Sequence, residues 1–178
     1  MARHAYPSID NLPEELAREI RARVTPGRGN VWRMLTWTPD AAAKFVDYSE
    51  AVRYRNAIPP KIRELIILRV GHLCGAAYEV HHHRRQGREV GMTESSIAAA
   101  TVGATAPGID EAERFALKMA DELVTDKQLS QATFDQAVKD HGVRTVADIV
   151  LLVGFYTMAC MFLNSFGIEI EQPPSNAR

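Results

Sequence analysis

Residues 59–83 read PPKIRELIILRVGHLCGAAYEVHHH, and this stretch decides which fold we expect. Its two leading prolines suit the first turn of a helix, where a missing N–H group costs nothing. The apolar residues that follow cover nearly the whole circumference of that helix, which predicts a central, buried helix. Glu64 is a polar residue within this apolar wall, and a buried carboxylate needs a partner or a function.

After Gly71 and Gly75 the chain is expected to break and to restart as a second helix. On that second helix Glu79 and His83 are four residues apart, so they share one face and lie one turn from each other. Neighbouring side chains on a helix point about 100° apart, so the three histidines 81–83 cannot all face one pocket. From the residues alone, a solvated surface position is the simpler interpretation of His83.

The chain resembles the alkylhydroperoxidase D-like, or carboxymuconolactone decarboxylase, family in several short segments: Arg63 to Val70, Gly75 to Glu79, His82-His83 and Gly91 to Glu94. The resemblance is strong over roughly residues 58–105 and weaker over the last long helix. It implies an all-α helical bundle, an inward-facing His83 and a functional Glu64. The decarboxylase branch carries Glu-x-x-x-His on this helix, which here is Glu79 and His83. In the peroxidase branch a Cys-x-x-Cys pair begins the same helix, but Ala76 and Glu79 occupy those two positions here.

The remaining sequence predicts about seven to nine helices in total, from apolar residues at helical spacing and from capping residues. We expect an N-terminal arm over residues 1–10, a single all-α domain over residues 11–170 and a flexible tail over residues 171–178. The first third of the domain is unlike the short family core, so we interpret it as an extra N-terminal helical layer or an oligomer-forming arm. Further helices are expected to begin at Thr93, Asp110, Ser130 and Thr145, the one from Ser130 ending at His141-Gly142.

Composition excludes several classes of protein. A length of 178 residues suits one domain, and the 46% hydrophobic and 24% charged shares are typical of soluble globular proteins. A net charge of −1 gives no electrostatic footprint for nucleic acid. The most apolar run, residues 149–166, is interrupted by small and polar residues, so we expect no membrane span. The absence of a leader and the presence of two isolated cysteines favour a reducing, cytoplasmic location.

Three kinds of function stay open, and the first is a non-redox acid–base enzyme of the decarboxylase or isomerase type. Its catalytic residues would be Glu64, Glu79 and His83, because a carboxylate near an imidazole orients and tunes it. A small carboxylated or lactone-like substrate would need a cation, and Arg69, Arg84 and Arg85 are candidates. Tyr78 is either a phenol donor at the site or a packing residue. No cofactor and no metal are expected.

The second kind is a thiol peroxidase, which needs a low-pKa thiolate and a nearby resolving thiol. Cys74 is out of register with the family pair and Cys160 is expected in the core, so peroxidase activity is disfavoured. The third kind is a non-catalytic oligomer that binds a metal or ligand through Glu79, His83 and Glu64. Glu64 could also simply pair with Arg63, Arg69 or Arg85. The family resemblance implies a homo-oligomer, a trimer or a hexamer, whatever the function.

Overall fold

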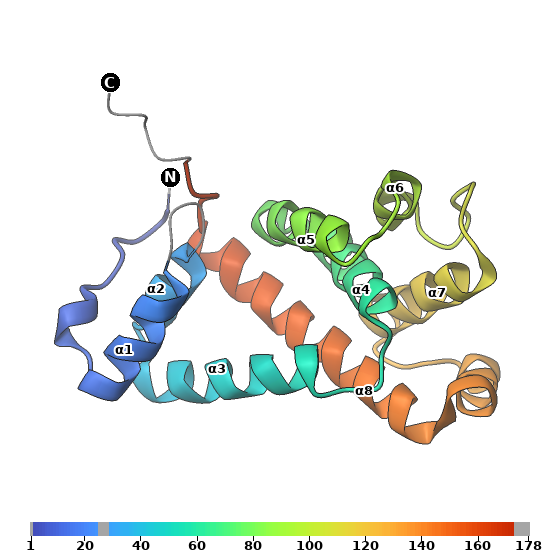
Figure 1. Ribbon diagram of the computed structural model, residues 1–178, viewed down its shortest axis with the longest axis horizontal. Helices are drawn as coiled ribbons and strands as arrows, with labels where there is room; N and C mark the ends of the chain where they lie inside the picture. The colour runs from blue at the N-terminus through green and yellow to red at the C-terminus, as the bar shows by residue number, and fades with distance from the viewer. Residues whose placement is uncertain (1, 25–28, 173–178) are drawn as a thin grey trace. The chain divides into compact units, whose positions relative to one another are not determined.

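The structure, a computed structural model, describes residues 2–24 and 29–172, and over these ranges the chain is all-α, as predicted (Figure 1). The described part holds one short 3-10 helix and eight α-helices, with no strand. In chain order they are η1 (Ile9–Asn11), α1 (Glu14–Arg23), α2 (Asn30–Leu35), α3 (Pro39–Tyr54), α4 (Pro60–Leu73), α5 (Ala77–Glu89), α6 (Glu94–Val102), α7 (Glu111–Thr125) and α8 (Gln131–Phe166).

The chain divides into two compact units, where the sequence led us to expect one domain over residues 11–170. The first comprises residues 1–50 and 162–178, and the second comprises residues 51–161. Helices α3 and α8 each begin in one unit and end in the other. Most of the expected tail, from residue 173 onward, lies outside the described residues.

The first unit has its own apolar core and includes the segment predicted as an N-terminal arm. Several hydrogen bonds hold this segment to the rest of the unit. Among them, the backbone N–H of Arg3 donates to the carbonyl of Phe166 at 2.9 Å, and Trp37 Nε1 donates to the carbonyl of Ala5 at 3.2 Å. The core is formed by apolar side chains from α1, α2 and α3, namely Leu16, Ile20, Leu35, Ala42 and Val46.

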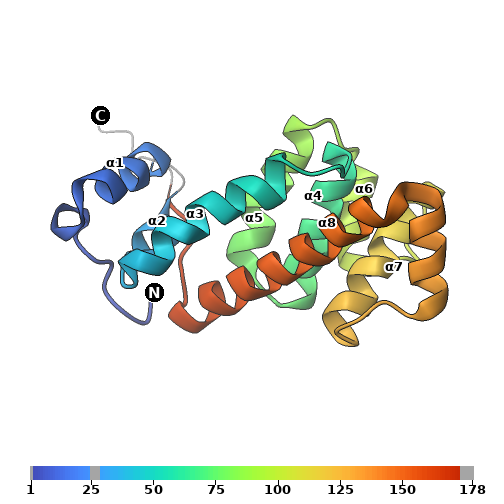
Figure 2. The same cartoon turned by 90° about the horizontal axis from the view of Figure 1, so that it is seen from below.

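Helix α4 is the centre of the second unit, and α5, α6 and α7 all pack against it (Figures 1 and 2). Residues 65–68 of α4 are fully buried, which confirms the central, buried helix predicted from its all-round hydrophobicity. The core here combines residues of α4, α6 and α7 with the turn before α6: Leu65, Leu68, Met92, Ile97, Ala99, Ala100, Ala106 and Leu117.

The turn between α4 and α5 packs the two helices against each other. Gly75 has φ +63°, a left-handed conformation that glycine adopts without steric cost. One turn earlier, a Cβ atom on Gly71 would lie 3.1 Å from Val80 Cγ2, so the missing side chain lets the two helices approach closely. The predicted break at these two glycines is therefore present, and it folds α5 back along α4.

Side-chain caps and one kink define the later helices. Thr93 caps α6, and Asp110 with Glu113 forms a capping box at the start of α7. Gly142, with φ 80° and ψ 153°, kinks α8 where a helix end was predicted. Thr145 does not begin a new helix by capping it; its hydroxyl donates to the carbonyl of His141 at 2.9 Å.

Helix α8 contains a strongly apolar window, with a mean hydropathy of 2.1 over 18 residues. By length and composition this window could cross a membrane. Half of it is buried inside the structure, and the core helix of a soluble protein passes the same test, so the window is weak support for a membrane span.

Candidate active site

His83 lies between two carboxylates in the second unit. Its Nδ1 is 2.6 Å from Glu64 Oε2, and its Nε2 is 2.9 Å from Glu79 Oε1. All three residues are buried, with exposed fractions of 1% for Glu64, 4% for His83 and 8% for Glu79. The sequence-based prediction that His83 meets one of these glutamates is confirmed, and the structure adds that it meets both.

Glu64 is also paired with its neighbour Arg63, whose Nε and Nη2 donate to Glu64 Oε1 at 3.2 and 3.1 Å. Arg63 is itself buried, and its guanidinium lies 5.4 Å from the centre of the Tyr54 ring. Glu64 is therefore both a histidine partner and an ion-pair partner. Its Oε2 atom faces His83, and its Oε1 atom accepts from Arg63. This arrangement satisfies a buried charge from two sides.

Two further residues from distant helices complete the cluster. The ring of Tyr156 on α8 meets the His83 ring edge to face, with centroids 5.2 Å apart and planes at 87°. Arg53 on α3 donates through Nη2 to Gln86, while its buried Nε has no hydrogen-bond partner. The charge of Arg53 acts on Glu64 and Tyr156, so this cation belongs to the same electrostatic environment.

The environment shifts the pKa values of the cluster in opposite directions. Burial lowers the pKa of His83, but the charges and hydrogen bonds of Glu64 and Glu79 outweigh it, and the net pKa is raised. Burial raises the pKa of Glu64, but His83, Arg53 and Arg63 outweigh that effect and lower it. Burial holds the pKa of Tyr156 well above its ordinary value, so its phenol stays protonated. The favoured state pairs the imidazolium of His83 with the carboxylate of Glu64.

Such an arrangement can carry a proton along the line from Glu79 through His83 to Glu64. Because both imidazole nitrogens already face carboxylate oxygens, the ring offers no free lone pair to a metal ion. Within residues 2–24 and 29–172, no group of three or more His, Cys, Asp or Glu side chains is arranged to hold a metal.

Arg69 and Tyr78, the other predicted substrate-binding residues, contact residues outside this cluster. Arg69 donates to Asp121 Oδ1 at 2.5 Å and to the carbonyls of Ala100 and Thr101 at 3.1 and 3.0 Å, which links α4 to α6 and α7. The Tyr78 ring is buried and packs 4.4 Å from the ring of His82. The contacts of Arg69 are structural in kind, since they join three helices.

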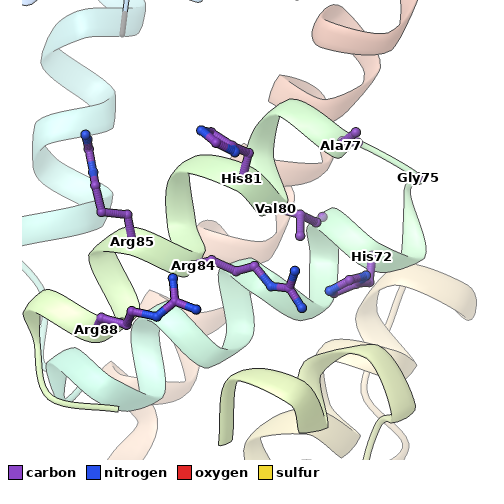
Figure 3. A pocket seen from close by; sticks show the side chains of 10 residues that line it. His72, Gly75, Ala77, Val80, His81, Arg84, Arg85 and Arg88 are labelled. Carbon is purple, nitrogen blue, oxygen red and sulfur yellow. The ribbon is translucent and has the colours of Figure 1, made fainter. Parts of the chain in front are cut away.

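Arg84 and Arg85 line a separate cavity of about 680 Å³ on the outer side of the α4–α5 turn. In Figure 3 the Arg84 side chain extends toward His72, while His81 and Arg85 point to another side of α5. Glu64, Glu79 and His83 are not among the residues that line this cavity. The two arginines are therefore not placed to hold a substrate against His83.

The two cysteines, Cys74 and Cys160, belong to the second unit, and each thiol is among the groups that shift the pKa of the other. Burial raises the pKa of both thiols, most strongly for Cys160. Neither sulfur has the low pKa of a peroxidatic cysteine.

Sequence reasoning missed Arg53, although a signal was present. Ala42, Val46, Ser49 and Arg53 follow helical spacing, so the arginine continues an apolar stripe and needs a buried partner, as Glu64 did. Tyr156 was one of several aromatic residues that could line a pocket, and nothing local distinguished it. Its role depends on which helix packs against α5.

Comparisons with known proteins agree with this architecture. Residues 39–122 match the model of the carboxymuconolactone decarboxylase family. No curated protein gives a significant match to the sequence.

Several solved structures share the fold over nearly the whole chain. One is an alkylhydroperoxidase AhpD core protein from Ralstonia eutropha, described as an uncharacterized peroxidase-related protein. It is 20% identical to this chain with a TM-score of 0.81, and the match covers 96% of this chain and 93% of the Ralstonia chain. A peroxidase-related protein from Silicibacter is 16% identical with a TM-score of 0.78, covering 98% and 92%. The debrominase Bmp8, solved with 2,3,4-tribromopyrrole, is 18% identical with a TM-score of 0.76, covering 96% and 94%.

At these identities the structural likeness establishes the fold and not the activity. The family match covers the helices that carry Arg53, Glu64, Glu79 and His83. Residues 39–122 therefore match the carboxymuconolactone decarboxylase family, and the chain has the alkylhydroperoxidase D-like fold.

Proposed function

We propose that this protein is a non-redox acid–base enzyme of the decarboxylase or isomerase type, acting on a small carboxylated or lactone-like compound through Glu79 and His83. The observation that carries the proposal is the position of His83, 2.6 Å from Glu64 and 2.9 Å from Glu79. A histidine held by two carboxylates can give or take a proton at a carbon next to a carbonyl group.

The two glutamates have different parts in this proposal. Glu64 is bound by Arg63 as well as His83, so it orients the ring and stabilises its protonated form. Glu79 has the larger exposed fraction, 8% against 1%, and its Oε1 lies 2.9 Å from the other nitrogen of the ring. We therefore assign Glu79 and His83 to the proton transfer and Glu64 to positioning.

Arg53 supplies what a carboxylated substrate requires. Its Nε is a buried donor without a hydrogen-bond partner, although one of its other nitrogens donates to Gln86. Leaving such a donor unsatisfied is unfavourable, and a bound carboxylate would accept from it. Arg53 therefore takes the role for which the sequence had suggested Arg69, Arg84 or Arg85.

The test is a screen of carboxylated lactones and enol acids in heavy water, followed by NMR. Proton transfer next to a carbonyl group replaces hydrogen by deuterium even when the overall equilibrium does not favour product. We expect Glu79→Gln and His83→Asn to lower the exchange rate by about 10²- to 10⁴-fold. His81→Asn is the control, since His81 is an exposed residue of the same helix, and its rate should equal that of the unmodified protein.

Circular dichroism and thermal unfolding must show that the slow variants remain folded. A folded His83→Asn protein with full exchange activity would refute the acid–base role. For Arg53, the informative variant is Arg53→Met with the acid and its methyl ester as paired substrates. We expect the KM for the acid to rise and the KM for the ester to stay unchanged.

The peroxidase-related names of two structural neighbours suggest the alternative of a thiol peroxidase. The raised pKa values of Cys74 and Cys160 argue against it, because little of either thiol is ionised at neutral pH. We expect no reduction of alkyl hydroperoxides with a dithiol donor. Such activity, lost in Cys74→Ser, would favour the peroxidase.

A further inference from the structure

The cavity of about 680 Å³ at the α4–α5 turn is lined by cationic and small side chains (Figure 3). Its titratable lining residues are three arginines and two histidines, namely His72, His81, Arg84, Arg85 and Arg88. Among the described residues, none contributes a carboxylate to this lining. Four of the five lie at positions 81, 84, 85 and 88 of α5, so they share the face opposite Glu79 and His83. The cavity is therefore a cation-rich site separate from the acid–base cluster.

Arg84 is the arginine of this cavity that is available to a ligand. Arg85 Nε lies 3.5 Å from Glu89 Oε1, and Arg88 donates to both carboxylate oxygens of Glu94 at 2.6 and 3.0 Å. By contrast, Arg84 has no ion-pair or hydrogen-bond partner among the residues that the structure describes. A guanidinium that has no such partner, in a cavity without a lining carboxylate, can bind an anion that enters from solvent.

The first turn of α5 opens on the same cavity and adds to its positive character. Ala77, the first residue of the helix, is exposed and lines the cavity. Ala76 before it provides no side-chain hydrogen bond to the first-turn N–H groups, which form the positive end of the helix dipole. Figure 3 shows Arg84 extended toward His72, at the end of the cavity where α4 ends and α5 begins. Burial lowers the pKa of His72, and the charges of Arg84 and Arg69 lower it further.

We propose that this cavity binds the phosphate groups of a small phosphorylated molecule, with Arg84 as their main side-chain ligand. A guanidinium matches phosphate oxygens with parallel hydrogen bonds, and the N-terminus of a helix favours phosphate groups. The volume of about 680 Å³ is typical of small-molecule sites and leaves room for more than an inorganic ion. Gly71, Ala76 and Val80 supply an apolar wall for the organic part of the molecule. The proposal does not depend on the acid–base activity.

Isothermal titration calorimetry of the native protein at constant ionic strength tests the proposal with three probes. Adenosine diphosphate carries both phosphate groups and an organic part, inorganic pyrophosphate carries only the phosphates, and adenosine carries only the organic part. We expect adenosine diphosphate to bind about tenfold more tightly than pyrophosphate, because it also buries apolar surface, and adenosine not to bind measurably. Adenosine binding as tightly as adenosine diphosphate would overturn the phosphate site, as would a protein that binds none of the three. Equal affinities for pyrophosphate and adenosine diphosphate would overturn the role of the apolar wall.

Two variants and a matched control test the assigned residues. Arg84→Met should weaken the binding of adenosine diphosphate about 10- to 100-fold, because a charged donor is lost. Ala77→Glu should also weaken it, because the new carboxylate repels phosphate, although the helix dipole favours an acid at this position. Arg55→Met removes the same charge at an exposed position outside the cavity lining and should leave the affinity unchanged. Equal affinities of Arg84→Met and Arg55→Met, with thermal unfolding like that of the unmodified protein, would overturn the proposal.

NMR of the ¹⁵N-labelled protein tests the place of binding. On addition of adenosine diphosphate, the amide signals of Gly75 and Ala77 should shift more than those of residues outside the cavity lining, because both residues line the cavity at the turn. Larger shifts elsewhere in the chain, with these two signals unmoved, would overturn the proposed position.

Discussion

The Nδ1 atom of His83 lies 2.6 Å from Oε2 of Glu64, so two residues 19 positions apart form one buried ion pair between α4 and α5. Burying the charge of Glu64 or of His83 alone would be unfavourable, because the charge would lose its hydration. The opposite charge of the partner offsets this cost. The pair therefore connects the stability of the helix hairpin to the chemistry proposed for His83.

Removal of the Glu64 carboxylate should destabilise the protein strongly. In Glu64→Ala, Arg63 and His83 would both lose their buried partner, and breaking a buried ion pair in this way costs about 3–5 kcal/mol. Urea unfolding followed by circular dichroism measures the change. Glu94→Ala is the control, because Glu94 makes a bidentate contact with Arg88 at an exposed position and should contribute little. Equal losses of unfolding free energy in Glu64→Ala and Glu94→Ala would contradict the buried ion pair of Glu64.

The contribution of the Glu64–His83 pair to stability should be lost at both ends of the pH range. The folded-state pKa of His83 is raised above 6.5, so its contribution is complete below pH 6.5 and is lost as the pH rises through the folded value. The folded-state pKa of Glu64 is lowered below 4.5, so its contribution is complete above pH 4.5 and is lost as the pH falls through the folded value.

The measurement compares the unmodified protein with the double variant Glu64→Gln/His83→Asn across this pH range. The difference in unfolding free energy should be largest between pH 4.5 and 6.5 and should shrink on either side. A difference that keeps growing as the pH rises above 6.5 would mean that His83 is neutral when folded.

Arg69 should be a structural residue and not a substrate-binding one. Arg69→Met would leave Asp121 and two backbone carbonyls without their charged donor, and hydrogen bonds to charged groups contribute about 1.5–3 kcal/mol each. We expect a loss of stability with no change in KM for any carboxylated substrate. Arg84→Met, at an exposed position on α5, is the control and should unfold like the unmodified protein. If Arg69→Met raised the KM and left the stability unchanged, Arg69 would be a substrate-binding residue.

The protein should assemble into a homo-oligomer, a trimer or a hexamer. One face of α8 exposes several large apolar side chains in the second unit, among them Leu151 at 51% and Met161 at 66%, with Val150 and Met158 nearby on the helix. Covering this face with another copy would bury apolar surface. Light scattering should give a multiple of the 19.8 kDa chain mass.

The double variant Leu151→Glu/Met161→Glu should shift the protein to smaller species. Ala132→Glu introduces the same charge at an exposed position in the first turn of α8 and should leave the mass unchanged. A monomeric mass for the unmodified protein at micromolar concentration would contradict the prediction.

The sequence by itself determined most of the helices, the caps Thr93 and Asp110, and the pairing of Glu79 with His83. These features are local: an i,i+4 spacing on a helix fixes which side chains share a face, whatever packs around them. Apolar residues around the whole circumference of α4 also identified the central helix correctly. The partnership of Glu64 with His83 needed the family resemblance in addition, because it joins two helices.

The tertiary structure alone decided which distant residues join that pair. Arg53 and Tyr156 come from α3 and α8. Arg69 illustrates the same limit of sequence reasoning. In the sequence it was as good a candidate for binding a substrate carboxylate as the other arginines, but in the structure it binds α6 and α7. Periodicity tells which face of a helix is buried but not which helix covers it, because that choice depends on packing between segments far apart in sequence.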